Sequence, residues 1–274
     1  MRFRAVLLIV FVSCAPGQGE PPPRPAAAPP TAKAPQRLRT EIVAVFPHDT
    51  AAYTQGLVFL GGALFESTGL YGASSVRRVE LATGKVEQEV KLPNSYFGEG
   101  LAAVEGRLVQ LTWREGLAFV YDAAQLLRTG ELRYPGDGWG LCWDGEHLVM
   151  SDGSALLTFR EPSTFAEVRK VLVQREGSAV YQLNELECVE GEIWANVYQS
   201  EDIVRIDPAS GEVTAVVNAT GLLTSEERQS AEVLNGIAWH TERKTFFLTG
   251  KFWPKLFEVR FVPVSPYSAT RGGS

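Results

Sequence analysis

Apolar and polar residues alternate along most of this chain in short runs, which is typical of β-strands with one buried face. In the first clear stretch, the runs predict four strands at 57–59, 63–67, 75–80 and 85–91. Helical periodicity is nearly absent. Only 224–232 predicts a helical turn, because Thr224 and Glu227 have the spacing of a capping box. We therefore expect an all-β fold.

The strand pattern returns along the chain, and five copies begin in the same way. Each has a variable residue, then Gly or Glu, then Leu or Ile, and then a turn and a second apolar run. We call the variable residues the head residues; they are Gln55, Glu99, Trp139, Asn184 and Asn235. They lie 44, 40, 45 and 51 positions apart, a spacing typical of one propeller blade per repeat. The sequence therefore predicts a five-bladed β-propeller with four-stranded antiparallel blades.

The last repeat supplies only three strands, the third at 256–261. A strand predicted at about 41–46, ahead of the first head residue, resembles the fourth strands of other repeats. We expect it to pair with 256–261 and close the ring, because this pairing removes two open sheet edges.

A second set of equivalent positions follows the head residues by 14 places, or by 16 in the last repeat. These positions hold Gly69, Trp113, Gly153, Tyr198 and Lys251. Equivalent positions of successive blades surround one axis, so both sets should meet at a single mouth. The head residues are mostly polar and differ from one another, which favours a binding site there over a packed core.

The composition limits the partners. The chain has 274 residues, 45% of them hydrophobic, enough for one large core. Acidic residues outnumber basic ones by 32 to 26 and there is no basic run, which argues against nucleic acid or an anionic membrane surface as partner. A small or peptide substrate fits better.

The N-terminal region is typical of an exported protein. Residues 1–13 predict a signal peptide, with Arg2 and Arg4 ahead of an apolar run too short to span a bilayer. Cys14 is the expected lipidation site, which would make this a periplasmic or cell-surface lipoprotein; an ordinary cleaved signal with an incidental Cys is the alternative. Residues 14–39 then form a Pro/Ala-rich tether, 40–262 the propeller and 263–274 a C-terminal tail.

The two other cysteines, Cys142 and Cys188, follow their head residues by three and four positions. Strand alternation points them to opposite sheet faces. We therefore expect two buried thiols rather than a disulfide, even in an oxidising compartment.

Eight ordered motifs at the repeat spacing resemble one family, the glutaminyl-peptide cyclotransferases of plant and bacterial type. The motifs are Tyr53-Thr54-Gln55-Gly56-Leu57, Glu66-Ser67-Thr68-Gly69-Leu70-Tyr71-Gly72, Gly98-Glu99-Gly100, Gln110-Leu111-Thr112-Trp113, Met150-Ser151-Asp152-Gly153-Ser154, Leu183-Asn184-Glu185-Leu186-Glu187, Val233-Leu234-Asn235-Gly236-Ile237 and Thr249-Gly250-Lys251-Phe252-Trp253-Pro254. The resemblance implies a five-bladed propeller that converts the N-terminal glutamine of peptides or proteins to 5-oxoproline and releases ammonia.

The resemblance also implies roles for individual residues. Glu99 would handle the proton, and Gln55, Trp113, Trp139, Asn184 and Lys251 would bind substrate or its oxyanion. Tyr198 stands where many members carry Trp, so an aromatic wall is kept with an added hydroxyl. Asn235, the fifth head residue, is a further candidate for substrate binding.

The chemistry supports these roles independently. One carboxylate between the attacking α-amine and the leaving nitrogen can act first as base and then as acid, if burial raises its pKa toward neutrality. Asn184 and Lys251 could stabilise the developing oxyanion. A cation beside Glu99 would lower the carboxyl pKa, so we expect Lys251 nearer to the substrate oxygen than to Glu99.

Other interpretations stay open at this point. The head residues could be turn formers and the tryptophans packing residues, in a non-catalytic propeller that binds peptides or proteins. A lactonase-like hydrolase would need acidic metal ligands on the axis, and His48, His147 and His240 form no ligand motif. We expect a monomer that needs no metal or cofactor.

Overall fold

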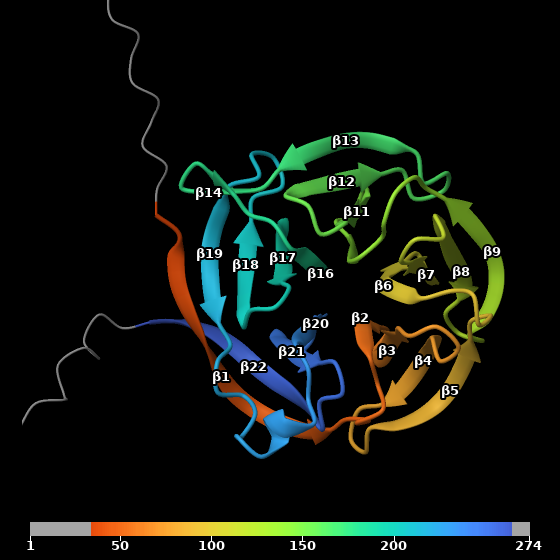
Figure 1. The fold of residues 1–274 in the computed structure, drawn as a ribbon, viewed down its shortest axis with the longest axis horizontal. Helices are drawn as coiled ribbons and strands as arrows, with labels where there is room; N and C mark the ends of the chain where they lie inside the picture. Colours follow the sequence, from red (N-terminus) through yellow and green to blue (C-terminus); the bar gives the residue numbers. More distant parts are fainter. Residues whose placement is uncertain (1–33, 265–274) are drawn as a thin grey trace, which may run out of the picture. The chain divides into compact units, whose positions relative to one another are not determined.

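The predicted strands are present, and the described residues form three antiparallel sheets of four strands, one mixed sheet of eight and one small hairpin. Figure 1 shows the strands arranged around one centre. The computed structural model describes residues 34–264, so the predicted signal peptide, Cys14 and most of the tail lie outside the described residues. The first sheet contains β2 (Thr54–Leu60), β3 (Ala63–Thr68), β4 (Ser75–Glu80) and β5 (Lys85–Lys91). These bounds confirm the four strands that the first repeat predicts.

Two further sheets repeat this arrangement. One contains β6 (Gly98–Val104), β7 (Arg107–Thr112), β8 (Leu117–Asp122) and β9 (Leu127–Arg133). The other contains β10 (Leu141–Trp143), β11 (Leu148–Met150), β12 (Leu156–Arg160) and β13 (Glu167–Leu172).

The remaining long strands form one mixed sheet of eight. Its order is β16 (Leu183–Val189), β17 (Glu192–Val197), β18 (Asp202–Ile206), β19 (Val213–Asn218), β1 (Gln36–Pro47), β22 (Lys255–Pro263), β21 (Thr245–Gly250) and β20 (Leu234–His240). β1 pairs antiparallel with β22, which confirms the predicted partner of 41–46. Its first residues pair in parallel with β19, so one strand joins two antiparallel sets of four.

The start of β1 corrects one boundary. The sequence assigned 14–39 to the tether, but Gln36 to Arg39 pair with β19, and Leu38 is buried in the core. The dense proline content ends at Pro35, and the alternating residues that follow can place Leu38 inward.

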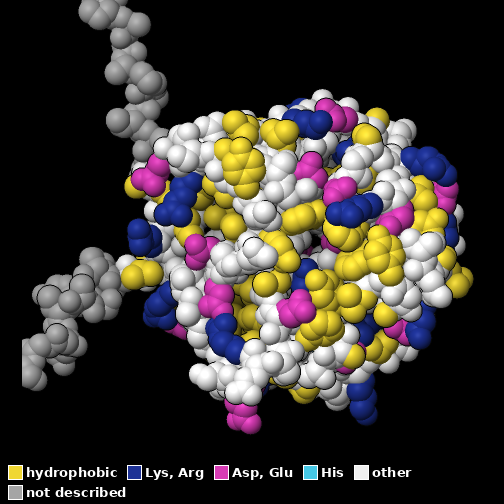
Figure 2. Space-filling model, viewed as in Figure 1, with side chains coloured by type: hydrophobic (Ala, Val, Ile, Leu, Met, Phe, Trp, Pro, Cys, Tyr) yellow, Lys and Arg dark blue, Asp and Glu magenta, His cyan; other side chains and the backbone are white. Residues whose placement is uncertain are grey.

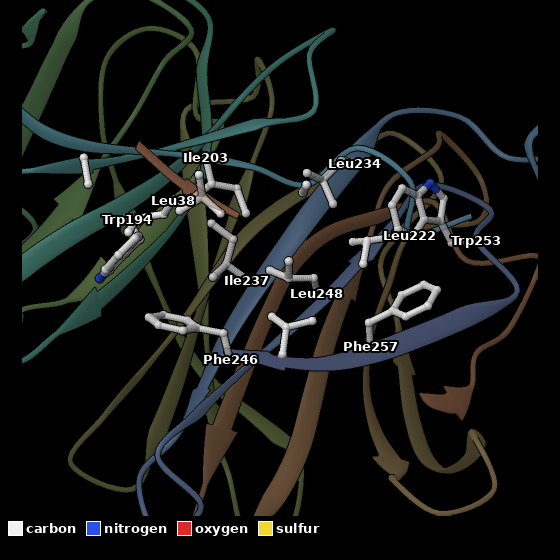
Figure 3. Packing of buried hydrophobic residues seen from close by; sticks show 14 of the residues in the cluster. Leu38, Trp194, Ile203, Leu222, Leu234, Ile237, Phe246, Leu248, Trp253 and Phe257 are labelled. Carbon is white, nitrogen blue, oxygen red and sulfur yellow. The ribbon is translucent and has the colours of Figure 1, made fainter. Parts of the chain in front are cut away.

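The innermost strands of these sets surround one centre. β2, β6, β10, β16 and β20 contact one another in this order, and β20 contacts β2 again. The core lies between neighbouring sets: in Figure 3, Trp194 and Ile203 of one half of the large sheet face Ile237 and Leu248 of the other. These inner strands therefore lie at the middle of the ring, where β2, β6, β16 and β20 can be followed in Figure 1.

The predicted helical turn is shorter than expected. The capping box is present, because the Thr224 N–H donates to Glu227 Oε2 (3.0 Å) and the Glu227 N–H donates to Thr224 Oγ1 (3.3 Å). Only a 3₁₀ turn, η1 (Glu227–Gln229), follows. A small hairpin of β14 (Gln174–Arg175) and β15 (Ser178–Ala179) was not predicted. Within 34–264, no helix has the length and apolarity needed to cross a bilayer.

The expectation of two buried thiols is wrong. Cys142 of β10 and Cys188 of β16 form a disulfide with their Cα atoms 5.4 Å apart. The two residues do lie on opposite faces of their own sheets, but these sheets are neighbours that pack face to face. Cys142 packs among residues of the β16 sheet such as Leu186, whereas the adjacent Leu141 packs toward the β6 sheet. Opposite faces are therefore the arrangement that a bridge between stacked sheets requires.

Candidate active site

A cavity of about 240 Å³ opens where the innermost strands converge. It is lined by Tyr53, Gln55, Phe97, Glu99, Trp113, Trp139, Asn184, Tyr198 and Lys251. Four of the five head residues and three of the second set thus share one cavity. The space-filling view shows a hollow near the centre of the ring (Figure 2). Asn235 does not line the cavity but lies behind Gln55.

Backbone irregularities at the head residues explain how they reach this cavity. The strand register shifts at Gln55, Glu99, Asn184 and Asn235, so these residues leave the regular ladder. The glycine that follows a head residue lets the inner strands approach. A Cβ on Gly100 would lie 2.6 Å from the backbone nitrogen of Leu141, and one on Gly140 would lie 2.0 Å from the backbone oxygen of Asn184. The repeated glycine is therefore a requirement of close backbone packing.

Glu185 takes the place of this glycine in the fourth repeat, and its carboxylate ties three inner strands together. It accepts hydrogen bonds from the backbone N–H groups of Leu57 (3.1 Å) and Ile237 (2.8 Å). Glu185 is fully buried, and burial raises its carboxyl pKa well above the usual range. Its contacts suit a structural role at the axis.

Glu99 is the acid that faces the cavity. Its side chain is 4% exposed, and Gln55 Nε2 donates to its Oε1 at 2.8 Å. Burial raises the carboxyl pKa well above its usual range; Lys251 acts in the opposite direction, and Glu115 and Asp137 add to the rise. A carboxyl with a raised pKa can both take and return a proton during a reaction.

Lys251 lies against aromatic rings. Its Nζ is 3.4 Å from the Tyr53 hydroxyl, 4.4 Å from the centre of the Tyr53 ring and 5.1 Å from that of Tyr198. Burial lowers the pKa of its ammonium, while Glu99 and Glu232 counteract this effect. Two π faces and the Tyr53 hydroxyl hold the cation, and no carboxylate of the described residues lies at salt-bridge distance from it. The charge can therefore stabilise a developing negative charge in the cavity.

Edge-to-face aromatic contacts build the walls. Phe97 contacts Trp113 with ring centres 5.5 Å apart, and Trp139 contacts Tyr198 at 5.7 Å. The two glycines of the second set make room for these rings. A Cβ on Gly69 would lie 2.3 Å from the Phe97 ring, and one on Gly153 would lie 2.7 Å from the Trp139 ring.

Comparison with known proteins decides the family. A family model described as glutamine cyclotransferase matches residues 19–261. The chain belongs to the glutamine cyclotransferase family. It is 45% identical over 234 residues to a glutaminyl-peptide cyclotransferase of Arabidopsis thaliana. The matched region covers 83% of this chain and 73% of that relative. It is also similar to a crystal structure of Myxococcus xanthus glutaminyl cyclase, with a TM-score of 0.77, 44% identity and coverage of 84% of this chain and 100% of the other.

Two polar atoms in the site of this cyclotransferase-family protein lack protein partners. Both atoms are buried: within the described residues, Trp139 Nε1 donates no hydrogen bond and Asn184 Oδ1 accepts none. Buried polar atoms are rarely left unpaired, and both atoms belong to residues that line the cavity. Between them they offer one donor and one acceptor.

Two lining residues of this family member were missed as site residues. Tyr53 and Phe97 each precede a head residue by two positions, so they occupy equivalent places in the first two repeats. An aromatic residue at that place in both repeats was the available signal. Among the described residues, no group of three or more His, Cys, Asp or Glu side chains is arranged to hold a metal ion.

Proposed function

We propose that this protein converts the N-terminal glutamine of peptides or proteins to 5-oxoproline and releases ammonia. The observation that carries the proposal is a single cavity in which buried Glu99 lies with Asn184 and Lys251 between aromatic walls. The family match and both relatives support the same reaction.

The reaction balances with Glu99 as the only proton carrier. The α-amine attacks the side-chain amide carbon, forming the ring C–N bond, and Glu99 takes one proton from that nitrogen. The tetrahedral intermediate then collapses, the C–N bond to the old amide nitrogen breaks, and Glu99 returns the proton so that ammonia leaves. In this scheme the Lys251 ammonium and a side-chain N–H of Asn184 stabilise the oxyanion, and Trp139 binds the substrate; all three residues line the cavity.

Other parts of the proposal concern the setting of this reaction. The two halves of the eight-stranded sheet count as two blades, which makes a five-bladed propeller. The scheme requires no metal or cofactor. The substrate is a peptide or protein rather than nucleic acid. The protein acts as a monomer, because residues of one chain line the whole cavity. Tyr198 keeps the aromatic wall, and its hydroxyl alters substrate preference.

We also propose that the protein is exported and anchored by lipid at Cys14. The disulfide between Cys142 and Cys188 supports an oxidising compartment, because such bonds are rare in the cytosol. The membrane is then a partner only through the anchor.

Ammonia release from a peptide that begins with glutamine tests the proposed activity. The full chain should release ammonia and give a peptide that is lighter by the mass of one ammonia molecule. Glu99→Gln should fold normally and lose most turnover, whereas Glu105→Gln, an exposed turn residue, should keep it. Equal turnover in both variants, or bound peptide without ammonia from the wild type, would refute the assignment; the second result would favour a peptide-binding propeller.

A further inference from the structure

Asn235, behind the cavity wall, donates one hydrogen bond to the Thr54 backbone and one to the Gln55 side chain. Its Nδ2 donates to the Thr54 backbone oxygen at 3.1 Å and to Gln55 Oε1 at 2.9 Å. Gln55 Nε2 then donates to Glu99 Oε1 at 2.8 Å. We call this chain of bonds from Asn235 through Gln55 to Glu99 the amide relay.

The direction of the amide relay is fixed by the Thr54 carbonyl. A backbone carbonyl can only accept, so the nitrogen of Asn235 must face it. That nitrogen also meets the Gln55 side chain, whose oxygen must therefore point toward Asn235. The nitrogen of Gln55 is left to face Glu99, so Oε1 of Glu99 can only accept.

Asn235 is unfavourable for folding at this position, and its contact with Gln55 offers a reason for its presence. It is fully buried, and its own Oδ1 has no hydrogen-bond partner among the described residues. A buried unpaired oxygen is unfavourable for folding. An apolar residue would avoid this penalty but would not orient Gln55.

We propose that Asn235 is a positioning residue that, through Gln55, confines proton exchange with the substrate to Oε2 of Glu99. Oε2 accepts no hydrogen bond from a described residue, and Glu99 lines the cavity. The inference rests on the proposed cyclisation. With the relay intact, every proton that Glu99 carries lies on the oxygen that can reach both substrate nitrogens.

Asn235→Asp is the sharpest variant, because it inverts the relay while keeping the shape. The new carboxyl oxygen faces the Thr54 carbonyl, so any proton on it is donated to that carbonyl and the oxygen accepts from Gln55. Gln55 must therefore turn its nitrogen toward position 235 and its oxygen toward Glu99. That oxygen disfavours ionised Glu99 and favours a proton on Oε1. We expect kcat to fall at least about tenfold, KM to change less than about threefold, and the acid limb of the kcat–pH profile to move up by about one unit or more.

Asn196→Asp is the matched control. Asn196 is also buried, and its Oδ1 accepts from the Gly236 N–H at 3.1 Å, next to Asn235. Among the described residues, no hydrogen bond joins Asn196 to Gln55. The variant introduces the same change of group in the same region. Its kcat–pH profile should stay within about 0.3 unit of the wild type, a small perturbation by comparison.

The groups that surround Glu99 remain constant in this comparison. They are Gln55, Lys251, Glu115 and Asp137, and neither variant replaces any of them. Thermal melts establish that each variant is folded. If Asn235→Asp does not fold, Gln55→Glu tests the same polarity, because it keeps an acceptor toward Asn235 and removes the donor toward Glu99; its acid limb should also move up.

Infrared titration measures the protonation of the Glu99 carboxyl as a function of pH and does not depend on turnover. The Glu99 signal is the difference between the spectra of each enzyme and of its Glu99→Gln counterpart. A wild type that releases no ammonia defeats the proposed function, whereas the titration still reports on the relay. A folded Asn235→Asp or Gln55→Glu enzyme with an unshifted Glu99 titration overturns the inference. An equal shift of the Glu99 titration in Asn196→Asp also overturns the inference. The shift would then result from any new buried charge and not from the hydrogen bond between Asn235 and Gln55.

Discussion

The Lys251 ammonium lies over the Tyr53 ring, 4.4 Å from its centre, with the Tyr53 hydroxyl 3.4 Å from Nζ. Tyr53 thus positions the cation through both its π face and its oxygen. The contact keeps Lys251 in the cavity although no carboxylate is paired with it at salt-bridge distance within the described residues.

Replacing Lys251 separates its two effects. Lys251→Met should lower kcat about 100-fold, the usual loss when one oxyanion-stabilising group is removed. Since Lys251 lowers the Glu99 pKa, its removal should also move the acid limb of the kcat–pH profile upward. Tyr53→Phe keeps the ring and should lose less than about tenfold. An unchanged acid limb in Lys251→Met would show that the cation acts too far from Glu99 to affect its ionisation.

Gly153 provides a test of the aromatic wall. It has a φ of 81°, and a Cβ there would meet the Trp139 ring at 2.7 Å. Gly153→Ala should therefore displace Trp139 and reduce kcat/KM by about 100-fold, the loss expected for a misplacement near 1 Å. Steady-state kinetics with a glutaminyl peptide measures it.

Gly177→Ala is the control for backbone strain. Gly177 has a nearly equal φ of 80°, but no atom lies within 4 Å of a Cβ built there. Both variants should lose roughly 1–2 kcal/mol of stability from the left-handed conformation. Only Gly153→Ala should lose activity; a similar activity loss in both would show that general destabilisation is responsible.

The sequence predicted the parts of the site that depend on repetition. Head residues at equivalent places had to meet, because the period of the strands was regular, and Gln55, Glu99, Trp139 and Asn184 do so. Asn235 did not line the cavity, since Gln55 stands between it and the opening. Sequence spacing gives the place in the ring but not the depth of a side chain.

The contacts between sheets were harder to predict. The disulfide was missed because alternation was applied to Cys142 and Cys188 as if their sheets did not stack. The glycines after the head residues were read as a pattern, and only the close approach of Gly100 and Gly140 to the neighbouring strand gave the reason. Such distances depend on how the sheets pack, which no single strand encodes.

The disulfide should stabilise the fold without taking part in the reaction. It joins β10 and β16, and neither cysteine lines the cavity. The double variant Cys142→Ala/Cys188→Ala should lose about 3 kcal/mol of unfolding free energy and keep its kcat at 25 °C. Chemical denaturation with and without reductant measures this. Reductant should destabilise the wild type and leave the double variant unchanged; a wild type insensitive to a reductant shown to cleave the bond would contradict the prediction.

A largely buried ion network links residues near the start of the described chain to the segment before β22. His48 Nε2 lies 3.0 Å from Glu66 Oε1, and His48 Nδ1 lies 2.7 Å from the Trp253 carbonyl oxygen. Both partners accept, so both ring nitrogens donate and His48 is charged. Arg77 pairs with the other Glu66 oxygen at 2.8 Å and with Asp49 at 2.8 Å.

The network sets the pH range of stability. Burial would lower the His48 pKa, but Glu66 and the Trp253 carbonyl together outweigh it, so the pKa is raised. Burial likewise would raise the Glu66 pKa, but Arg77 and His48 lower it to about 2. The His48 contribution is therefore complete below its unfolded pKa of about 6.5 and is lost as pH rises through the folded value. The Glu66 contribution is present above about pH 4.5 and is lost as pH falls toward 2.

Two variants test this network by urea unfolding between pH 5 and 9. Glu66→Gln should lower the unfolding free energy by about 3–5 kcal/mol, because it leaves buried cations without their shared partner. His48→Gln should be less stable than the wild type at pH 5, and the difference should shrink toward pH 9, since only the charged imidazole contributes. His147, whose ring lies 3.9 Å from Glu146 away from this network, supplies the control: His147→Gln should follow the wild-type curve. A His48→Gln deficit that is the same at pH 5 and pH 9 would mean that His48 acts by packing and not through its charge.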